Sequence, residues 1–187
     1  MHKSFLTLSV ILGAFGCVNS NPSLYTLQPA PLEELSSYPN EIRIGVNEVR
    51  LPDYARDVRF AARQEDGSIV HLEEHRWADN PTRVVTRVLA VNLRELTARP
   101  VFGEPWPVTF EPTVFVAVDF FELDATRAGE MRFQGQFVLH KRDSDTEPHV
   151  ESFEISSSVS GESFDAVMRD IAGALAELAT RIAKAAG

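Results

Sequence analysis

Two stretches in the last third of the chain alternate between apolar and polar side chains. Their apolar members are Met131, Phe133, Phe137, Leu139, Phe153, Ile155 and Val159. Such alternation is typical of strands that bury one face and leave the other in water. A polar loop from Lys141 to Pro148 joins the two stretches. The pattern therefore predicts a long antiparallel hairpin with one solvent-exposed face.

Two helical patterns can cover the apolar face of such a hairpin. The stripe nearer the C-terminus consists of Phe164, Val167, Met168, Ile171, Leu175, Leu178 and Ile182. Ser163 is suited to cap this helix, and Asp165 suits its positive end. The other helix opens at Asp79-Asn80-Pro81 and stops before Pro100. Its stripe consists of Val84, Val85, Val88, Leu89, Leu93 and Leu96.

Shorter patterns predict the remaining strands. Tyr25-Thr26-Leu27 is a small strand candidate, and the segment Glu41 to Leu51 alternates until its phase changes near Asn47. That change indicates a bulge or a strand end. Val58 to Ala62 alternates as a half-buried strand, and Asp66-Gly67 predicts a tight turn into a returning strand, Ser68 to Leu72.

The stretch from Val114 to Phe121 is apolar on both faces, apart from Asp119. It predicts a central strand that is covered on both sides. Together the patterns predict a single-domain α/β (α+β) fold over residues 25–187, in which a mixed, mostly antiparallel sheet packs against two long helices.

The N-terminus resembles an export signal. Lys3 precedes an apolar run from Phe5 to Phe15, which is too short to span a bilayer and ends at Cys17, the single cysteine of the chain. We expect residues 1–16 to be a lipoprotein signal and Cys17 to carry acyl chains, with residues 17–24 as a short tether. The alternative is ordinary signal cleavage after Gly16, which leaves a spare thiol.

Charge and cysteine content exclude several classes of protein. Without Lys3 the mature chain has 17 basic and 27 acidic side chains, a net charge of −10. Such a chain is a poor candidate for binding nucleic acid or anionic membrane surfaces. With one cysteine, no disulfide can form within the chain.

Two motifs have catalytic counterparts. The segment His71-Leu72-Glu73-Glu74-His75 fits a zinc-peptidase pattern, but a strand would separate its histidines by about 13 Å, too far to share one ion. The segment Gly161 to Asp165 lies where a hydrolase elbow would lie, yet it lacks the closing glycine, and no histidine follows Ser163. Asp119 lacks a second carboxylate placed to work with it. We expect no catalytic residue, metal or cofactor.

Several landmarks follow one another in a characteristic order. They are Tyr25-Thr26-Leu27, Val49 to Tyr54, His75-Arg76-Trp77-Ala78-Asp79, Arg87 to Leu93, and Pro105-Trp106-Pro107. Together with the signal they resemble the auxiliary lipoproteins of ABC-type transport systems, similar to the paraquat-inducible C component. The resemblance implies a non-enzymatic, lipid-anchored protein at the outer membrane that faces the periplasm and docks onto an MCE-domain protein of a lipid transporter.

The resemblance is also compatible with rings of several copies. It leaves His75, Arg76, Trp77 and Trp106 as candidates for a partner interface or for structural anchors. Two other hypotheses stay open: a stand-alone periplasmic protein that binds a hydrophobic ligand, and a metal- or serine-dependent hydrolase.

Overall fold

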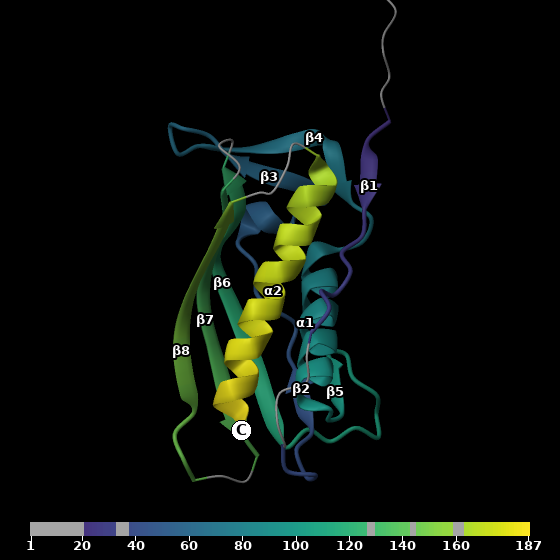
Figure 1. Ribbon diagram of the computed structural model, residues 1–187, viewed down its shortest axis with the longest axis vertical. Helices are drawn as coiled ribbons and strands as arrows, with labels where there is room; N and C mark the ends of the chain where they lie inside the picture. The colour runs from purple at the N-terminus through teal and green to yellow at the C-terminus, as the bar shows by residue number, and fades with distance from the viewer. Residues whose placement is uncertain (1–20, 33–37, 127–129, 143–144, 159–162) are drawn as a thin grey trace, which may run out of the picture.

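The computed structural model describes residues 21–32, 38–126, 130–142, 145–158 and 163–187. Within these residues an eight-stranded open sheet carries two long helices, which lie side by side on one face (Figure 1). The elements in chain order are β1 Ser23–Tyr25, β2 Ile44–Val46, the 3-10 helix η1 Asp53–Arg56, β3 Arg59–Arg63, β4 Ile69–Trp77, α1 Pro81–Thr97, β5 Val101–Gly103, β6 Val114–Thr126, β7 Glu130–Lys141, β8 His149–Ser158 and α2 Phe164–Ala186. The predicted single-domain fold of a mixed sheet and two helices is confirmed.

Strand β6 is the centre of the sheet. One of its edges pairs with β7, and β7 pairs with β8, both antiparallel. The other edge pairs in parallel with β2 near Val114 and with β3 near Ala125, so the sheet divides there into two arms. The arm of β2 continues to β5, and the arm of β3 continues to β4 and β1. These arms lie at opposite ends of the molecule (Figure 1).

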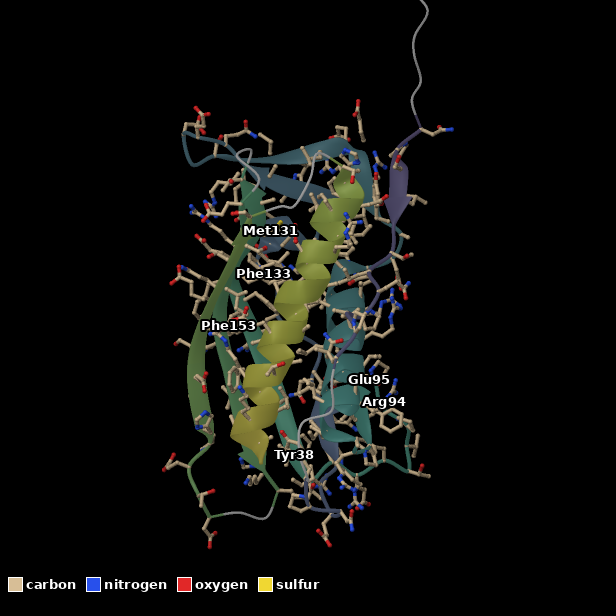
Figure 2. All side chains as sticks on the ribbon, in the orientation of Figure 1. Tyr38, Arg94, Glu95, Met131, Phe133 and Phe153 are labelled. Atoms are coloured by element: carbon tan, nitrogen blue, oxygen red, sulfur yellow. The ribbon has the colours of Figure 1, made fainter. Side chains whose placement is uncertain are left out.

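The predicted hairpin is confirmed as β7 and β8, apart from Val159, which lies outside the described residues. Met131, Phe133 and Phe153 are buried and point from the hairpin toward α2 (Figure 2). The expectation that β6 is covered on both faces is wrong. Phe115 and Ala117 are half-buried and Phe121 is 54% exposed, because both helices lie on the opposite face of the sheet.

A β-bulge between Phe120 and Glu122 divides β6. Before the bulge the even-numbered residues Val114 to Phe120 are buried against the helices, and after it the odd-numbered Leu123 and Ala125 take that side. Gly135 lies opposite the bulge, where an added Cβ atom would be only 2.2 Å from the carbonyl oxygen of Asp119. Glycine alone fits this close approach of the two backbones.

Both helices lie close to the predicted positions. In α1 the Asn80 side chain accepts a hydrogen bond from the backbone N–H of Arg83, and Ala98 ends the helix in the left-handed region at φ 50°. Ser163 occupies the N-cap position of α2, but its side chain makes no capping hydrogen bond. Asp165 in the first turn is the acidic group that suits this positive helix end.

Smaller differences concern strand ends. The predicted strand at Tyr25-Thr26-Leu27 ends at Tyr25, and the phase change near Asn47 marks the end of β2. The returning strand does not end at Leu72 but continues to Trp77, because β1 and β3 both pair with β4 there. Residues 1–16 and Cys17 lie outside the described residues. Among the described helices, none is both long and apolar enough to span a membrane.

One buried polar group in α1 stands out. Asn92 is fully buried, and neither its amide nitrogen nor its amide oxygen has a hydrogen-bond partner among the described residues. Burial of an unpartnered amide costs free energy that an apolar side chain of similar shape would not cost.

We therefore predict that Asn92→Leu raises the free energy of unfolding by about 1–2 kcal/mol, as measured by urea denaturation. The matched control is Thr97→Val in the same helix. Thr97 is also buried, but its hydroxyl donates to the Leu93 carbonyl at 2.7 Å, so its loss lowers stability by about 1 kcal/mol. A loss of stability in Asn92→Leu would contradict the assignment of an unpartnered amide.

Candidate functional site

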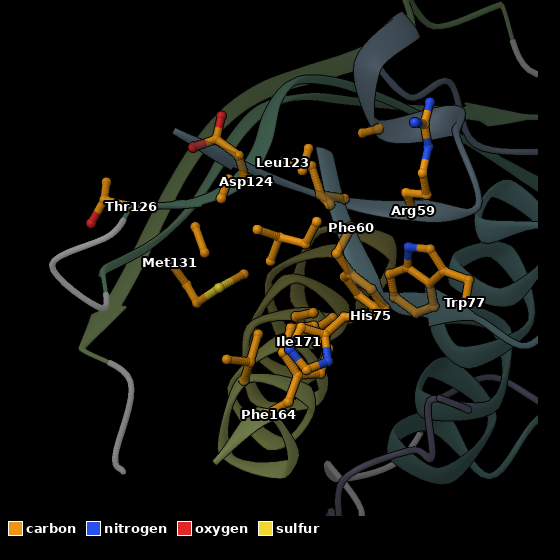
Figure 3. Close-up of a pocket in the computed structure, with 16 residues that line it drawn as sticks. Arg59, Phe60, His75, Trp77, Leu123, Asp124, Thr126, Met131, Phe164 and Ile171 are labelled. Carbon is orange, nitrogen blue, oxygen red and sulfur yellow. The ribbon is translucent and has the colours of Figure 1, made fainter. Parts of the chain in front are cut away.

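An apolar pocket of about 220 Å³ lies between the first turns of α2 and the arm of the sheet that holds β3 and β4 (Figure 3). Below, it is called the α2 pocket. Its walls come from six elements: η1, β3, β4, β6, β7 and α2. Among the lining residues are Phe60, Trp77, Leu123, Met131, Phe164 and Ile171.

Stacked rings form one side of the α2 pocket. Trp77 is buried and stacks on Phe60 with ring centroids 4.3 Å apart. The His75 ring lies parallel to Phe164 at 4.1 Å, and Tyr25 contacts Phe164 at 4.6 Å. These rings join the N-terminal strand β1, the strand β4 and the start of α2 in one cluster.

The two histidines of the zinc-peptidase pattern lie on β4 and have separate partners. His71 Nε2 lies 3.0 Å from the carbonyl oxygen of Tyr54, and His75 Nδ1 lies 3.2 Å from the hydroxyl of Tyr25. The zinc-peptidase hypothesis is wrong, because that chemistry needs both histidines on one face of a helix. In the described parts of the chain, no group of three or more His, Cys, Asp or Glu residues could hold a metal ion.

A buried ion pair supports the sheet beside the α2 pocket. The Asp124 side chain is 0% exposed and accepts from Arg63 Nη2 at 2.6 Å and from Arg63 Nε at 3.2 Å. The Tyr54 hydroxyl donates to Asp124 at 3.0 Å. Burial is the main cause that raises the pKa of Tyr54 to about 12. The hydrogen bond from Arg63 to Asp124 raises the pKa of Arg63.

Arg59 also lines the α2 pocket but is paired outside it. Its guanidinium donates to Asp57 at 2.8 Å and to Glu73 at 2.7 Å. The hydrogen bonds from Arg59 hold the pKa of the Asp57 carboxyl well below its usual range. The Arg76 side chain lies on the opposite face of β4 from those of its neighbours His75 and Trp77. Its Nη2 atom lies 3.5 Å from Oε2 of Glu73.

A second cluster of aromatic residues lies at the opposite end of the sheet, around the connection from β5 to β6. Phe102 packs edge-on against Phe110 at 4.7 Å, and Trp106 lies 6.2 Å from Phe115. Trp106 is half-buried. Val108, which lies between Trp106 and Phe110 in the sequence, is fully exposed. We call residues 102–110 the distal aromatic segment.

Asp119, the acidic exception in β6, is not a buried acid. It is paired with Arg50 at 3.1 Å on the open face of the sheet, where the Arg50 side chain is largely exposed. Nothing in this arrangement activates a nucleophile or a proton donor.

The structure brings two of the four candidate residues together. His75 and Trp77 line the α2 pocket, Arg76 lies on the other face of β4, and Trp106 belongs to the distal aromatic segment. Cys17 and the residues Gly161 and Glu162 of the hydrolase pattern lie outside the described residues. The sequence pattern indicated Phe60 and Phe164 as core positions but did not indicate the pocket between them, because its walls are far apart in sequence.

The family model of the ABC-type transport auxiliary lipoprotein component matches residues 25–183. No curated protein matches the chain. An uncharacterized protein of known crystal structure is similar with a TM-score of 0.72 and 18% identity, over 89% of this chain and 99% of that one. Protein XCC0632 from Xanthomonas campestris is similar with a TM-score of 0.68 and 14% identity, over 86% and 92%. At these identities the two structures show a shared fold.

The buried ion pair generates a stability prediction. We expect Arg63→Ala to lower the free energy of unfolding by about 3 kcal/mol or more, because it leaves the Asp124 carboxylate buried without its countercharge. The measurement is urea denaturation at neutral pH. The control is Arg56→Ala, which removes an exposed pair with Asp53 and should cost less than about 1 kcal/mol. Equal, small losses in both variants would contradict the assigned role of Arg63.

Proposed function

Since this chain belongs to the family of ABC-type transport auxiliary lipoprotein components, we propose that it is the lipid-anchored periplasmic component of an MCE-type lipid transport system, held at the outer membrane and docked onto the MCE-domain protein. The observation that carries this proposal is the family match over nearly the whole mature domain. Val18 after Cys17 supports the outer membrane, because an aspartate at that position commonly retains lipoproteins at the inner membrane.

The position of β1 supports attachment at one end of the molecule. β1 pairs with β4 at His75 to Trp77, so Ser23 lies at the β3 and β4 end of the sheet (Figure 1). His75 and Trp77 also line the α2 pocket. Cys17 lies six residues before Ser23, which allows a tether of about 20 Å at most. Acyl chains on Cys17 would therefore hold the β3 and β4 end of the domain close to the membrane.

The opposite end is then turned toward the periplasm. It presents the distal aromatic segment, in which Phe102 and Val108 are large exposed apolar side chains. Contiguous exposed apolar patches are typical of protein interaction sites, and aromatic residues are enriched in the hot spots of such sites. The MCE-domain protein approaches from the periplasm, so the distal aromatic segment is the surface that it meets first.

The protein acts by binding and not by catalysis. The family is described as a transport auxiliary component. The acidic and histidine side chains that the sequence singled out are engaged in structural contacts: Asp119 with Arg50, His75 with Tyr25 and Phe164. The remaining hydrolase candidate, Ser163, stands at the cap position of α2.

The docking hypothesis predicts the effect of one surface substitution. Val108→Asp places a charge in the distal aromatic segment and should weaken binding to the MCE-domain protein of the proposed transport system by about tenfold or more. Affinity is measured by biolayer interferometry with the purified proteins. The matched control is Val150→Asp on β8, another exposed valine, which should leave the affinity unchanged.

Two outcomes would contradict docking as described. If the unaltered protein does not bind the MCE-domain protein, the proposed partner is wrong. If Val108→Asp and Val150→Asp weaken binding equally, the partner is right and the distal aromatic segment is not its docking surface.

The anchor has its own prediction. Cys17→Ser should move the protein from the membrane fraction to the soluble periplasm, because the acyl chains are the proposed source of membrane affinity. Immunoblots of osmotic-shock and membrane fractions measure the distribution. A variant that stays in the membrane fraction through high-salt washes would contradict anchoring through Cys17.

A further inference from the structure

We propose that the α2 pocket binds a single alkyl chain and leaves any polar head group of that ligand in solvent. This ligand site goes beyond the docking function and does not depend on docking, because the α2 pocket and the distal aromatic segment lie at opposite ends of the sheet. It rests on the proposed anchor at Cys17 only for the source of the alkyl chain.

The size of the pocket limits the ligand. Its volume is about 220 Å³. An apolar cavity of about 150 Å³ binds one benzene molecule, whereas sites for drug-sized ligands have volumes of about 300–1,000 Å³. The α2 pocket therefore has room for one segment of alkyl chain but not for a whole phospholipid.

The chemistry of the walls selects an apolar ligand. The rings of Phe60, Trp77 and Phe164 lie beside the aliphatic side chains of Leu123 and Ile171. The two charged residues that contribute to the lining, Arg59 and Asp124, point their charged groups away from this apolar centre (Figure 3).

Those charged groups are also already paired. Arg59 donates to Asp57 and Glu73, and Asp124 accepts from Arg63 and Tyr54. The pocket thus offers no free charge to a polar group of the ligand. A polar head group would lose its hydration in the pocket without gaining a charged partner, so it remains in solvent.

The position of the pocket favours an alkyl chain over an apolar side chain of a protein partner. The Tyr25 ring at the end of β1 contacts Phe164 and His75, which line the pocket. Cys17 is eight residues before Tyr25, a reach of less than about 30 Å. Alkyl chains are therefore within reach from two sources: the acyl chains on Cys17 and lipids of the adjacent membrane.

Trp77 is a natural reporter for this pocket. In Trp106→Phe it is the single tryptophan of the chain. We expect 12-bromododecanoic acid, below its micelle concentration, to quench Trp77 fluorescence with saturation between about 10 and 100 μM, because the bromine at the chain end contacts the ring. The protein is the full mature chain with Cys17→Ser. In Trp77→Phe, which leaves Trp106 alone, we expect no saturable quenching.

Two pocket-filling variants test the location. Val167 on α2 and Leu72 on β4 are half-buried lining residues. Val167→Phe and Leu72→Phe should each weaken binding by about tenfold. The added ring displaces part of the alkyl chain, and loss of burial for two methylene groups is enough to cause this change in affinity. Circular dichroism identifies the variants that remain folded, and the comparison uses those. No saturable quenching of Trp77, or undiminished quenching in both folded variants, would overturn the proposal.

A final comparison distinguishes the two sources of the alkyl chain. If the acyl chains on Cys17 fill the pocket, acylated Trp106→Phe protein will resist quenching while its Cys17→Ser counterpart responds. If membrane lipids supply the chain, both forms will respond, and native mass spectrometry of the Cys17→Ser protein will detect a non-covalent lipid. Both results support an alkyl-chain site, and neither depends on whether the MCE-domain protein binds.

Discussion

Backbone hydrogen bonds along the two edges of β6 join every part of the sheet. One edge is used by β7 along almost the whole strand, and the other is shared by β2 and β3. Because β2 and β3 pair with different halves of β6, the two arms diverge toward opposite ends of the molecule. The helices then pack on the common apolar face, where Leu89 and Leu93 of α1 and Leu175 and Leu178 of α2 are fully buried. The pocket at one end and the aromatic segment at the other both follow from this division.

Much of the fold could be predicted from the sequence, because its longest elements have regular periodicity. The stripe of α2 and the alternation of β7 and β8 indicated both the elements and their buried faces. The prediction failed for β6 because apolar composition was taken as evidence of burial. Phe115 and Phe121 are apolar, yet they lie on the open face of the sheet. Similarly, Glu73 and Glu74 concealed the continuation of β4, which pairing with its neighbours determines.

The candidate site was less accessible to sequence reasoning. His75 and Trp77 were indicated as landmarks, and their shared side of a strand follows from their spacing. The α2 pocket, however, depends on Phe60, Leu123 and Phe164 meeting across more than 100 positions of sequence. Asp124 gave no signal at all, because an aspartate near a predicted strand end is ordinary. Only the structure shows that it is completely buried and that Arg63 and Tyr54 partner it.

The bulge in β6 has a consequence for how this chain can change in length. If β6 alternated regularly beyond Phe120 with all its residues in place, Glu122 and Asp124 would take the side of the strand that Leu123 and Ala125 now occupy. Two carboxylates would then face the helices, and Asp124 would lose Arg63 and Tyr54. Removal of Phe121 avoids this, because Phe120 and Glu122 already pair with the consecutive residues Gly135 and Gln134 of β7, so Leu123 keeps its side. A single insertion after the bulge, by contrast, would exchange the two faces over the rest of the strand.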